Sequence, residues 1–346
     1  MKSVRIWLWI GVVMVLVQVM VGGITRLTES GLSITEWDVL MGSMPPTSNE
    51  AWQAEFESYK QSAQFEKVNT DFTVNQFKSI YWWEFIHRLW ARLIGMVFLF
   101  PFIYFVIKKK FNGSWIRKLL IVFVLGGLQG FVGWVMVASG LDGDPWVDPS
   151  KLTIHLLLAL TVFMYLIWLA LSYRKKDIIT NHPTANKGIK YILALILIQI
   201  ALGGLMAGTD AARVYNTYPL MNGAFVPSGA FTNLSSVEKL VELTPEINFL
   251  HRTFAIIVAL AIIVFWFQHR KFSSPIMHKL NNALLAGLVI QFFLGIFTLL
   301  GSKINIPVML GVTHQVVAFL LLGVAVAIWF YSAPRKGFEP LATITK

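Results

Sequence analysis

The chain has 346 residues, of which 56% are hydrophobic and only 14% are charged, and its mean hydropathy is +0.63. These values exclude an ordinary soluble domain. The net charge of +11 does not indicate nucleic-acid binding, because Lys and Arg gather beside the hydrophobic segments, as the positive-inside rule requires. The chain contains no cysteine, so a metal must be held by His or carboxylate groups, or lie within a porphyrin.

Eight hydrophobic segments are each close to the ~20 residues that an α-helix needs to cross a bilayer. In chain order, the predicted membrane helices are Ile6–Ile24, Glu84–Ile107, Ile116–Ala138, Leu152–Leu171, Gly188–Ala207, Ile247–Phe267, Lys279–Leu300 and Val308–Phe330. The first segment lacks a small-residue cleavage site, so we expect a retained helix rather than a signal peptide. The sequence therefore predicts an all-α integral membrane protein with eight transmembrane helices.

Basic residues mark one side of this membrane domain. Lys and Arg cluster at 108–118, 174–190, 270–279 and 335–336, whereas the opposite connections are acidic or nearly neutral. By the positive-inside rule, both termini are expected to be cytoplasmic. No organelle presequence precedes the first helix, which favours a bacterial plasma (inner) membrane.

The long outer loop 25–83 is expected to contain a helix of its own. Thr47 and Glu50 have the spacing of a capping box. The residues that then recur at helical spacing are Trp52, Phe56, Tyr59 and Ala63. We expect this helix at the outer membrane surface, where it either lies on the bilayer or packs onto the transmembrane helices.

Two signatures repeat along the predicted helices. In each odd-numbered helix a Gln precedes a Gly by four residues, and the pairs are Gln18/Gly22, Gln129/Gly133, Gln199/Gly203 and Gln291/Gly295. Each even-numbered helix carries one His near its outer end, namely His87, His155, His251 and His314. The pattern predicts two parallel-repeat four-helix bundles, 1–173 and 174–346. The glycines allow either close helix packing or space for a flat ligand.

The four repeated histidines are candidate metal ligands. No further strong ligand repeats at this level, which disfavours zinc and di-iron carboxylate sites. Two imidazoles on facing helices can instead bind one haem iron from opposite sides. We therefore predict one site from His87 and His155 and another from His251 and His314. The other histidines lie in predicted cytoplasmic connections and are expected to be solvated; they are His182, His269 and His278.

An arginine follows the first histidine of each half. Arg88 and Arg252 are placed where a guanidinium could pair with haem propionates. Interfacial snorkelling of either side chain is the alternative. These positions are candidate contacts for the propionates of two haems.

The two halves differ beside these residues. Glu84 lies three positions before His87 and on the same helix face, whereas the second half has Asn248 there and Glu246 nearer water. An ionisable acid at membrane depth is a functional candidate. The first site is therefore expected to be reactive and the second to carry electrons. Alternatives for Glu84 are a hydrogen bond to a partner helix, or a place at the helix N-terminus where its charge suits the dipole.

Taken together, several motifs resemble the heme A synthase family. The matching stretches are 22–33 (GGITRLTESGLS), Pro45-Pro46, 84–88 (EFIHR), 215–221 (YNTYPLM), His251-Arg252 and His314-Gln315. They are distributed over nearly the whole chain and are specific as a set. The absence of cysteine resembles the proteobacterial and mitochondrial branch of the family.

The resemblance implies roles for the candidate residues. His87 and His155 would frame the site for the substrate, haem O, near Arg88, and His251 and His314 would ligate a resident haem B near Arg252. The implied reaction oxidises the haem O ring methyl, through a hydroxymethyl stage, to the formyl group of haem A. Glu84 would accept the proton or stabilise positive charge. Two histidines on the substrate iron would favour water as the oxygen source.

The implied partners are a haem O synthase, the cytochrome oxidase assembly machinery, membrane lipid and an unknown electron acceptor, for which a quinone is a candidate. A homo-oligomer is also possible. Two other functions remain open at this point. A di-haem b-type quinol oxidoreductase would use the same paired histidines, and a transporter would use the parallel repeat. The transporter would need a midplane site with broken helices, whereas the polar residues here gather at the outer end.

Overall fold

The computed structural model describes residues 2–35, 44–173, 181–227, 230–231 and 244–334, and within them all regular secondary structure is helical. Eight helices are long and apolar enough to cross a membrane, as predicted. They are α1 (Lys2–Leu27), α4 (Val74–Ile107), α5 (Gly113–Leu141), α6 (Pro149–Ser172), α7 (Pro183–Gly208), α10 (Thr244–His269), α11 (Pro275–Gly301) and α12 (Val308–Ser332). Three shorter helices are α2 (Asn49–Tyr59), α3 (Ala63–Lys67) and α8 (Ala211–Val214).

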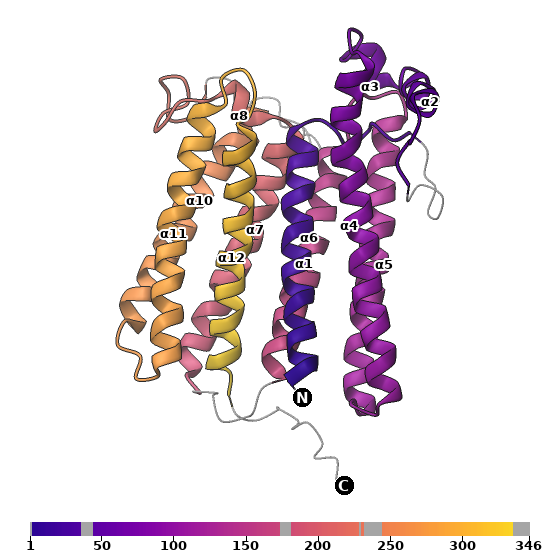
Figure 1. Cartoon of the computed structure of the whole chain (residues 1–346). Helices are drawn as coiled ribbons and strands as arrows, with labels where there is room; N and C mark the ends of the chain where they lie inside the picture. Colours follow the sequence, from indigo (N-terminus) through magenta and orange to yellow (C-terminus); the bar gives the residue numbers. More distant parts are fainter. Residues whose placement is uncertain (1, 36–43, 174–180, 228–229, 232–243, 335–346) are drawn as a thin grey trace.

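The eight long helices run side by side, and the short helices gather at one end of them (Figure 1). Helix α1 begins and α12 ends at the opposite end. The basic connections 108–112 and 270–274 lie at that same end, as the predicted orientation requires. This arrangement supports cytoplasmic termini, which stay a prediction.

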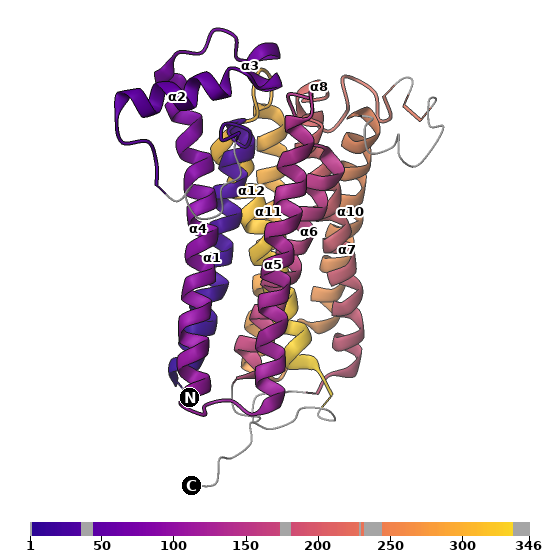
Figure 2. The same ribbon diagram turned by 90° about the vertical axis from the view of Figure 1, so that its right-hand side faces the viewer.

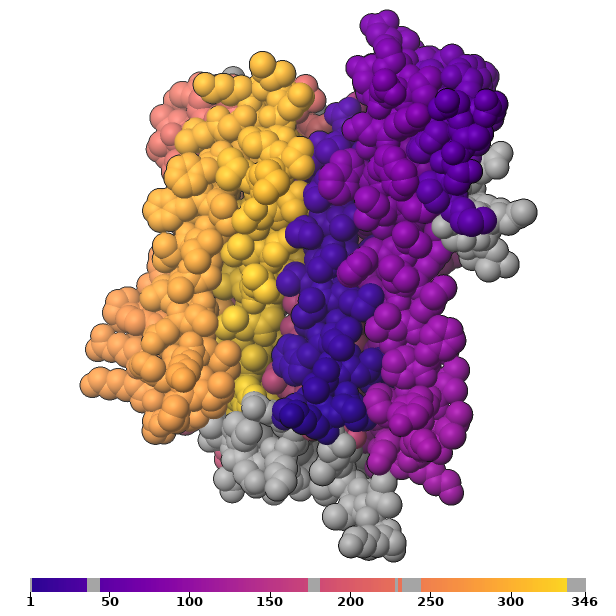
Figure 3. All heavy atoms as spheres, in the orientation of Figure 1, coloured from indigo at the N-terminus to yellow at the C-terminus, as the bar shows by residue number. Residues whose placement is uncertain are grey.

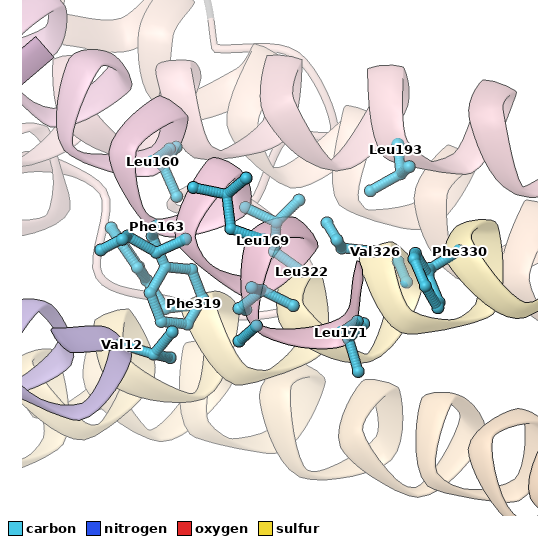
Figure 4. Close-up of a cluster of buried hydrophobic side chains, with 14 of the residues drawn as sticks. Val12, Leu160, Phe163, Leu169, Leu171, Leu193, Phe319, Leu322, Val326 and Phe330 are labelled. Atoms are coloured by element: carbon cyan, nitrogen blue, oxygen red, sulfur yellow. The ribbon is translucent and has the colours of Figure 1, made fainter. Parts of the chain in front are cut away.

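Helices α1, α6, α7 and α12 form the centre of the molecule. Each packs against two or three of the others, and α1 lies beside α12 on the face shown in Figure 3. Their apolar side chains interlock along the axis, and the rings of Phe163 and Phe319 meet at 5.4 Å near Val12 (Figure 4). The predicted segments 1–173 and 174–346 therefore share one hydrophobic core, although their relation as a parallel repeat stays a prediction.

Helix α4 begins ten residues earlier than expected from hydropathy. Its 34 residues span about 51 Å, well beyond a bilayer core of ~30 Å. A capping box between Thr73 and Gln76 closes its N-terminus. Glu84 is therefore three turns inside the helix, and its suggested place at a helix N-terminus is wrong.

The outer extension of α4 is the surface onto which α2 packs. Trp52, Phe56 and Tyr59 are buried against Phe77 and Tyr81 of α4. Of the two alternatives for this amphipathic helix, the structure thus supports packing onto a membrane helix. Two details differ from prediction: the N-cap is Ser48 rather than Thr47, and Ala63 belongs to the next helix, α3.

The flanking helices pack differently in the two halves. Helix α10 packs against both α7 and α11, and α11 packs against α12. In the first half α4 packs on α1 and α5 packs on α6, but α4 and α5 are not a closely packed pair (Figure 2). The second half is therefore closed between its flanking helices, and the first half is not.

Candidate functional site

All four repeated histidines line one cavity of about 880 Å³. Every membrane helix contributes to its lining, which is mostly apolar, and the volume suits a cofactor or a large ligand. His87 on α4 is near enough to His155 on α6 for the two imidazoles to interact electrostatically, and His251 on α10 is likewise near His314 on α12. The structure thus pairs the histidines as the sequence predicts.

Each histidine in the first half is held by a glutamine of the neighbouring helix. The Gln18 Nε2 atom on α1 lies 3.2 Å from both ring nitrogens of His87 and donates to its backbone oxygen at 3.1 Å. On α5, the Gln129 Nε2 atom lies 3.3 and 3.1 Å from the ring nitrogens of His155 and donates to its backbone oxygen at 3.2 Å. Each repeated Gln of the first half therefore contacts both the ring and the main chain of a repeated His.

The second half repeats this geometry. The Gln199 Nε2 atom lies 3.1 and 3.4 Å from the ring nitrogens of His251 and donates to its backbone oxygen at 3.0 Å. The Gln291 Nε2 atom lies 3.3 Å from His314 Nε2. In every case the glutamine belongs to the odd-numbered and the histidine to the even-numbered membrane helix.

The repeated glycines make room for the imidazoles. A Cβ atom added to Gly22 would lie 2.9 Å from Cε1 of His87, and one added to Gly133 would lie 2.8 Å from Cε1 of His155. The same distances are 3.3 Å at Gly203 and 3.0 Å at Gly295, toward His251 and His314. These glycines thus leave space for a histidine ring, a role that differs from both close helix packing and space for a flat ligand.

The residues present suit haem. The two imidazoles of each pair line an apolar cavity, where they would supply nitrogen ligands to a haem iron, and the Oε1 atoms of all four glutamines are buried without a protein partner. Among the described residues, no three His, Asp or Glu side chains converge on one point, so a closed site of hard or borderline ligands is not formed there.

Glu84 is buried and has three donors. Its Oε2 atom accepts hydrogen bonds from Ser33 Oγ at 2.8 Å and from the backbone N–H of Ile34 at 2.9 Å. Its Oε1 atom forms an ion pair with Arg88 at 2.5 Å, one turn further along α4. Arg88 also donates to the backbone oxygen of Ile34 at 3.1 Å. The pair joins the start of the first outer loop to α4 at the edge of the cavity.

Arg252 occupies the comparable place in the second half. Its guanidinium donates to the backbone oxygens of Thr217 and Pro219 and lies over the ring of Tyr218. Its Nη1 atom is buried without a protein partner, although the side chain lines the cavity. A buried guanidinium nitrogen that faces a cavity suits an anionic group such as a carboxylate.

Asn248 does not occupy the place beside the cavity that the comparison with Glu84 predicts. It is fully buried, and its amide donates to the backbone oxygens of Ala211 and Tyr215, so it anchors helix α8. Glu246, expected nearer water, is also buried and accepts from the backbone N–H of Phe231 at 2.7 Å. Both expectations were wrong because Ala211, Tyr215 and Phe231 lie against this end of α10, where they contact the two side chains.

A polar cluster between the halves joins Arg26 and Glu29, which lie within the motif 22–33, to Asp210, which belongs to no motif. Arg26 on α1 donates to Asp210 at 3.1 Å and to the backbone oxygen of Ala207 at 2.6 Å. Glu29 lies beside this pair. Its pKa is raised by partial burial and by the charge of Asp210, whereas Arg26 and Arg213 act to lower it. Sequence reasoning missed the cluster because its members are about 180 positions apart.

Two of the remaining histidines are not simply solvated. His182 and His269 are half-buried around Phe272, and the rings of His269 and Phe272 stack at 5.1 Å. Only His278 is exposed, as expected, and it contacts Asn282 on the same helix. None of the three lines the cavity.

Between α4 and α5 the cavity lining is rich in glycine. It includes Gly95 on α4 and Gly126, Gly127 and Gly130 on α5, and a Cβ at any of these positions would have no neighbour within 4 Å. The cavity therefore has free space at the side of the first half where the flanking helices do not pack. The second half has no such gap, because α10 packs on α11.

The fold and the site define a class: multi-pass helical membrane proteins whose paired histidines suit haem. Residues 5–326 match the family described as cytochrome oxidase assembly protein. Curated relatives named heme A synthase include one from Flavobacterium johnsoniae, 42% identical over 93% of this chain and 95% of its own length. Others come from Parvibaculum lavamentivorans (41% identical, 92% of both chains) and Nitrosospira multiformis (38%, covering 97% and 94%). The chain belongs to this family, as the resemblance predicted.

Proposed function

We propose that this protein is a heme A synthase, an integral membrane enzyme that oxidises the ring methyl of haem O, through a hydroxymethyl stage, to the formyl group of haem A. The observation that carries this proposal is the pairing of imidazoles on facing helices, twice, within one membrane cavity of a chain in this family. The product would serve a terminal oxidase, in keeping with the family description.

Haem O is assigned to the first half, between His87 and His155. The free space lined by Gly126, Gly127 and Gly130 supports this assignment, because an exchanging substrate with a long isoprenoid chain needs an opening toward the lipid. Haem B is assigned to His251 and His314, where the close packing of α10 on α11 suits a resident group. When bound, haem B would supply one-electron redox chemistry.

Arg88 and Arg252 are assigned to the haem propionates. Arg252 fits this role with its unpartnered Nη1 atom. Arg88 is positioned for it by Glu84, whose carboxylate holds the guanidinium at the cavity edge. Each arginine would orient one porphyrin by charge-assisted hydrogen bonds.

Glu84 is assigned an electrostatic role in the reaction. Removing electrons from the substrate macrocycle leaves positive charge, which a fixed carboxylate stabilises at low dielectric. The three donors around Glu84 keep it oriented as an acceptor. Proton acceptance by Glu84, the other predicted role, would require it to give up one of these contacts. With two histidines on the substrate iron, water is the proposed oxygen source.

The setting of the enzyme follows from the same features. We assign the protein to the bacterial inner membrane with cytoplasmic termini, and the haem sites to the outer part of the membrane. A haem O synthase would supply the substrate, and a membrane electron acceptor such as a quinone would remove the electrons. The oligomeric state is part of this proposal only as a possible homo-oligomer.

The haem content of purified protein tests the proposal. Wild type should yield haem B together with haem O or haem A, and Glu84→Ala should accumulate haem O or its hydroxymethyl form. His251→Leu should lose haem B and keep the substrate haem. Haem B alone, at two per chain in both wild type and Glu84→Ala, would instead identify a di-haem electron-transfer protein.

A further inference from the structure

The four glutamines that contact the histidines form the most regular feature of the cavity. Each sits one helical turn before a glycine whose Cα faces the same imidazole. Gln18, Gln129 and Gln199 each also donate from Nε2 to the backbone oxygen of their histidine. A histidine is thus fixed at two points, its main chain and its ring, by one amide from the neighbouring helix.

The other end of each amide is not used within the chain. The Oε1 atoms of Gln18, Gln129, Gln199 and Gln291 are all buried without a protein partner. A buried carbonyl oxygen without a donor is unfavourable, so four equivalent cases call for a common explanation. In the Gln291 pair, His314 Nδ1 is buried and unpartnered as well.

Metal ligation by an imidazole provides that explanation. A histidine that binds a metal through one nitrogen carries a proton on the other, and that N–H needs an acceptor, which also orients the ring. Each glutamine lies against the ring and has a spare carbonyl oxygen. A half-turn of the amide would offer this oxygen to the imidazole N–H, in place of the Nε2 contact to the histidine backbone oxygen that the first three glutamines make.

We propose that Gln18, Gln129, Gln199 and Gln291 are positioning residues for the haem ligands, each accepting the second N–H of one axial histidine through Oε1. This inference rests on the haem ligation proposed above. The amide sets the ring orientation, fixes which nitrogen faces the iron, and raises the electron density that the imidazole donates. The Gln-x-x-x-Gly signature then serves to position a histidine ligand rather than to pack two helices together.

The resident haem of the second half offers the test, using the purified holoprotein. In Gln199→Leu the acceptor for His251 is lost, so haem affinity should fall about 10- to 100-fold. The haem midpoint potential should rise, because the imidazole donates less electron density. Gln199→Glu retains the length of the side chain and offers an anionic acceptor, so it should keep the low-spin bis-histidine spectrum and lower the midpoint potential.

Asn186→Leu is the matched control. Asn186 lies on the same helix, α7, and its side chain donates to the backbone oxygen of Trp329 and to Ser332 Oγ on α12, but it does not line the cavity of the four histidines. Its loss should weaken helix packing without moving the haem potential. If Gln199→Leu does not fold, Gln199→Glu decides alone.

Three outcomes separate the possibilities. Opposite shifts of the potential in Gln199→Leu and Gln199→Glu, with none in Asn186→Leu, support the positioning role. Unchanged potentials and spectra in folded Gln199 variants, or an equal shift in Asn186→Leu, would overturn it. Because the readout is the resident haem rather than turnover, opposite shifts in a protein that never converts haem O would overturn only the proposed function.

Discussion

Arg26 of α1 and Asp210, which follows α7, form an ion pair at 3.1 Å that joins the outer ends of the two halves. Both side chains are largely removed from water, at 15% and 27% exposure, and Arg26 also binds the backbone oxygen of Ala207. Arg26 lines the cavity that contains all four histidines. The ion pair therefore connects the segments 1–173 and 174–346 beside this cavity.

Disrupting this pair should loosen the junction. Arg26→Gln is expected to destabilise the detergent-solubilised protein by about 1.5–3 kcal/mol, the usual loss for a hydrogen bond to a charged group. A double-mutant cycle with Asp210→Asn should give a coupling of about 0.5–3 kcal/mol. Thermal unfolding of the two single variants and the double variant measures both quantities, and additive effects would show that the pair does not couple the halves.

Glu29 should make stability depend on pH. Its pKa is raised above 4.5 by burial and by the nearby Asp210, with Arg26 and Arg213 acting in the opposite direction. Glu29 contributes its full stabilisation at pH values below its ordinary pKa. This stabilisation is lost as the pH rises through the raised pKa of the folded state, because the folded chain then holds a disfavoured charge. Glu29→Gln should flatten this part of the profile and be the more stable protein at neutral pH.

Thermal midpoints of wild type and Glu29→Gln across the acid range test this expectation. Glu57→Gln is a suitable control, because Glu57 is exposed on α2 and pairs only with groups of its own segment. Parallel pH profiles for wild type and Glu29→Gln would contradict the assignment.

Hydropathy and motif spacing were enough to predict the eight membrane helices and the grouping of the histidines. The partners of those residues were not predictable in the same way. The Gln-x-x-x-Gly repeat was visible in the sequence, but only the packing of α1 on α4 shows that Gln18 and Gly22 face His87. The start of α4 was missed because its first turns are polar and are covered by α2 rather than by lipid.

Local loops account for the errors at the second site. Asn248 matches Glu84 by position, but its amide donates to backbone oxygens of the segment 211–215, whereas the Glu84 carboxylate accepts from Ser33, Ile34 and Arg88. Arg26 and Asp210 meet for a similar reason, since tertiary packing unites residues that no spacing rule connects. Motifs therefore located the histidines of the cavity, whereas the partners of the charged groups around them could be found only from the fold.

The glycines that face imidazoles should tolerate no side chain. In Gly133→Ala the new Cβ would lie 2.8 Å from Cε1 of His155, so the ring must move, at a cost of about 1–3 kcal/mol. Gly130→Ala, one turn earlier on α5, places its Cβ in open space and should be neutral or slightly stabilising, because alanine favours the helix. Thermal stability and the spectrum of haem in the first half should separate the two variants. Equal behaviour would show that Gly133 does not cradle His155.

The gap between α4 and α5 allows a test of which half takes the substrate. Gly127→Phe adds a large ring to the cavity lining, where glycine now has no neighbour within 4 Å. We expect at least a roughly tenfold loss of haem O uptake, since a filled pocket excludes a bulky ligand, with the resident haem B retained. Val124→Phe is the control, because Val124 lies on the same helix, is 69% exposed and does not line the cavity.

Extracted haem composition of both variants provides the readout. Loss of haem B instead of haem O in Gly127→Phe would reverse the assignment of the two halves, because the open side would then belong to the cofactor.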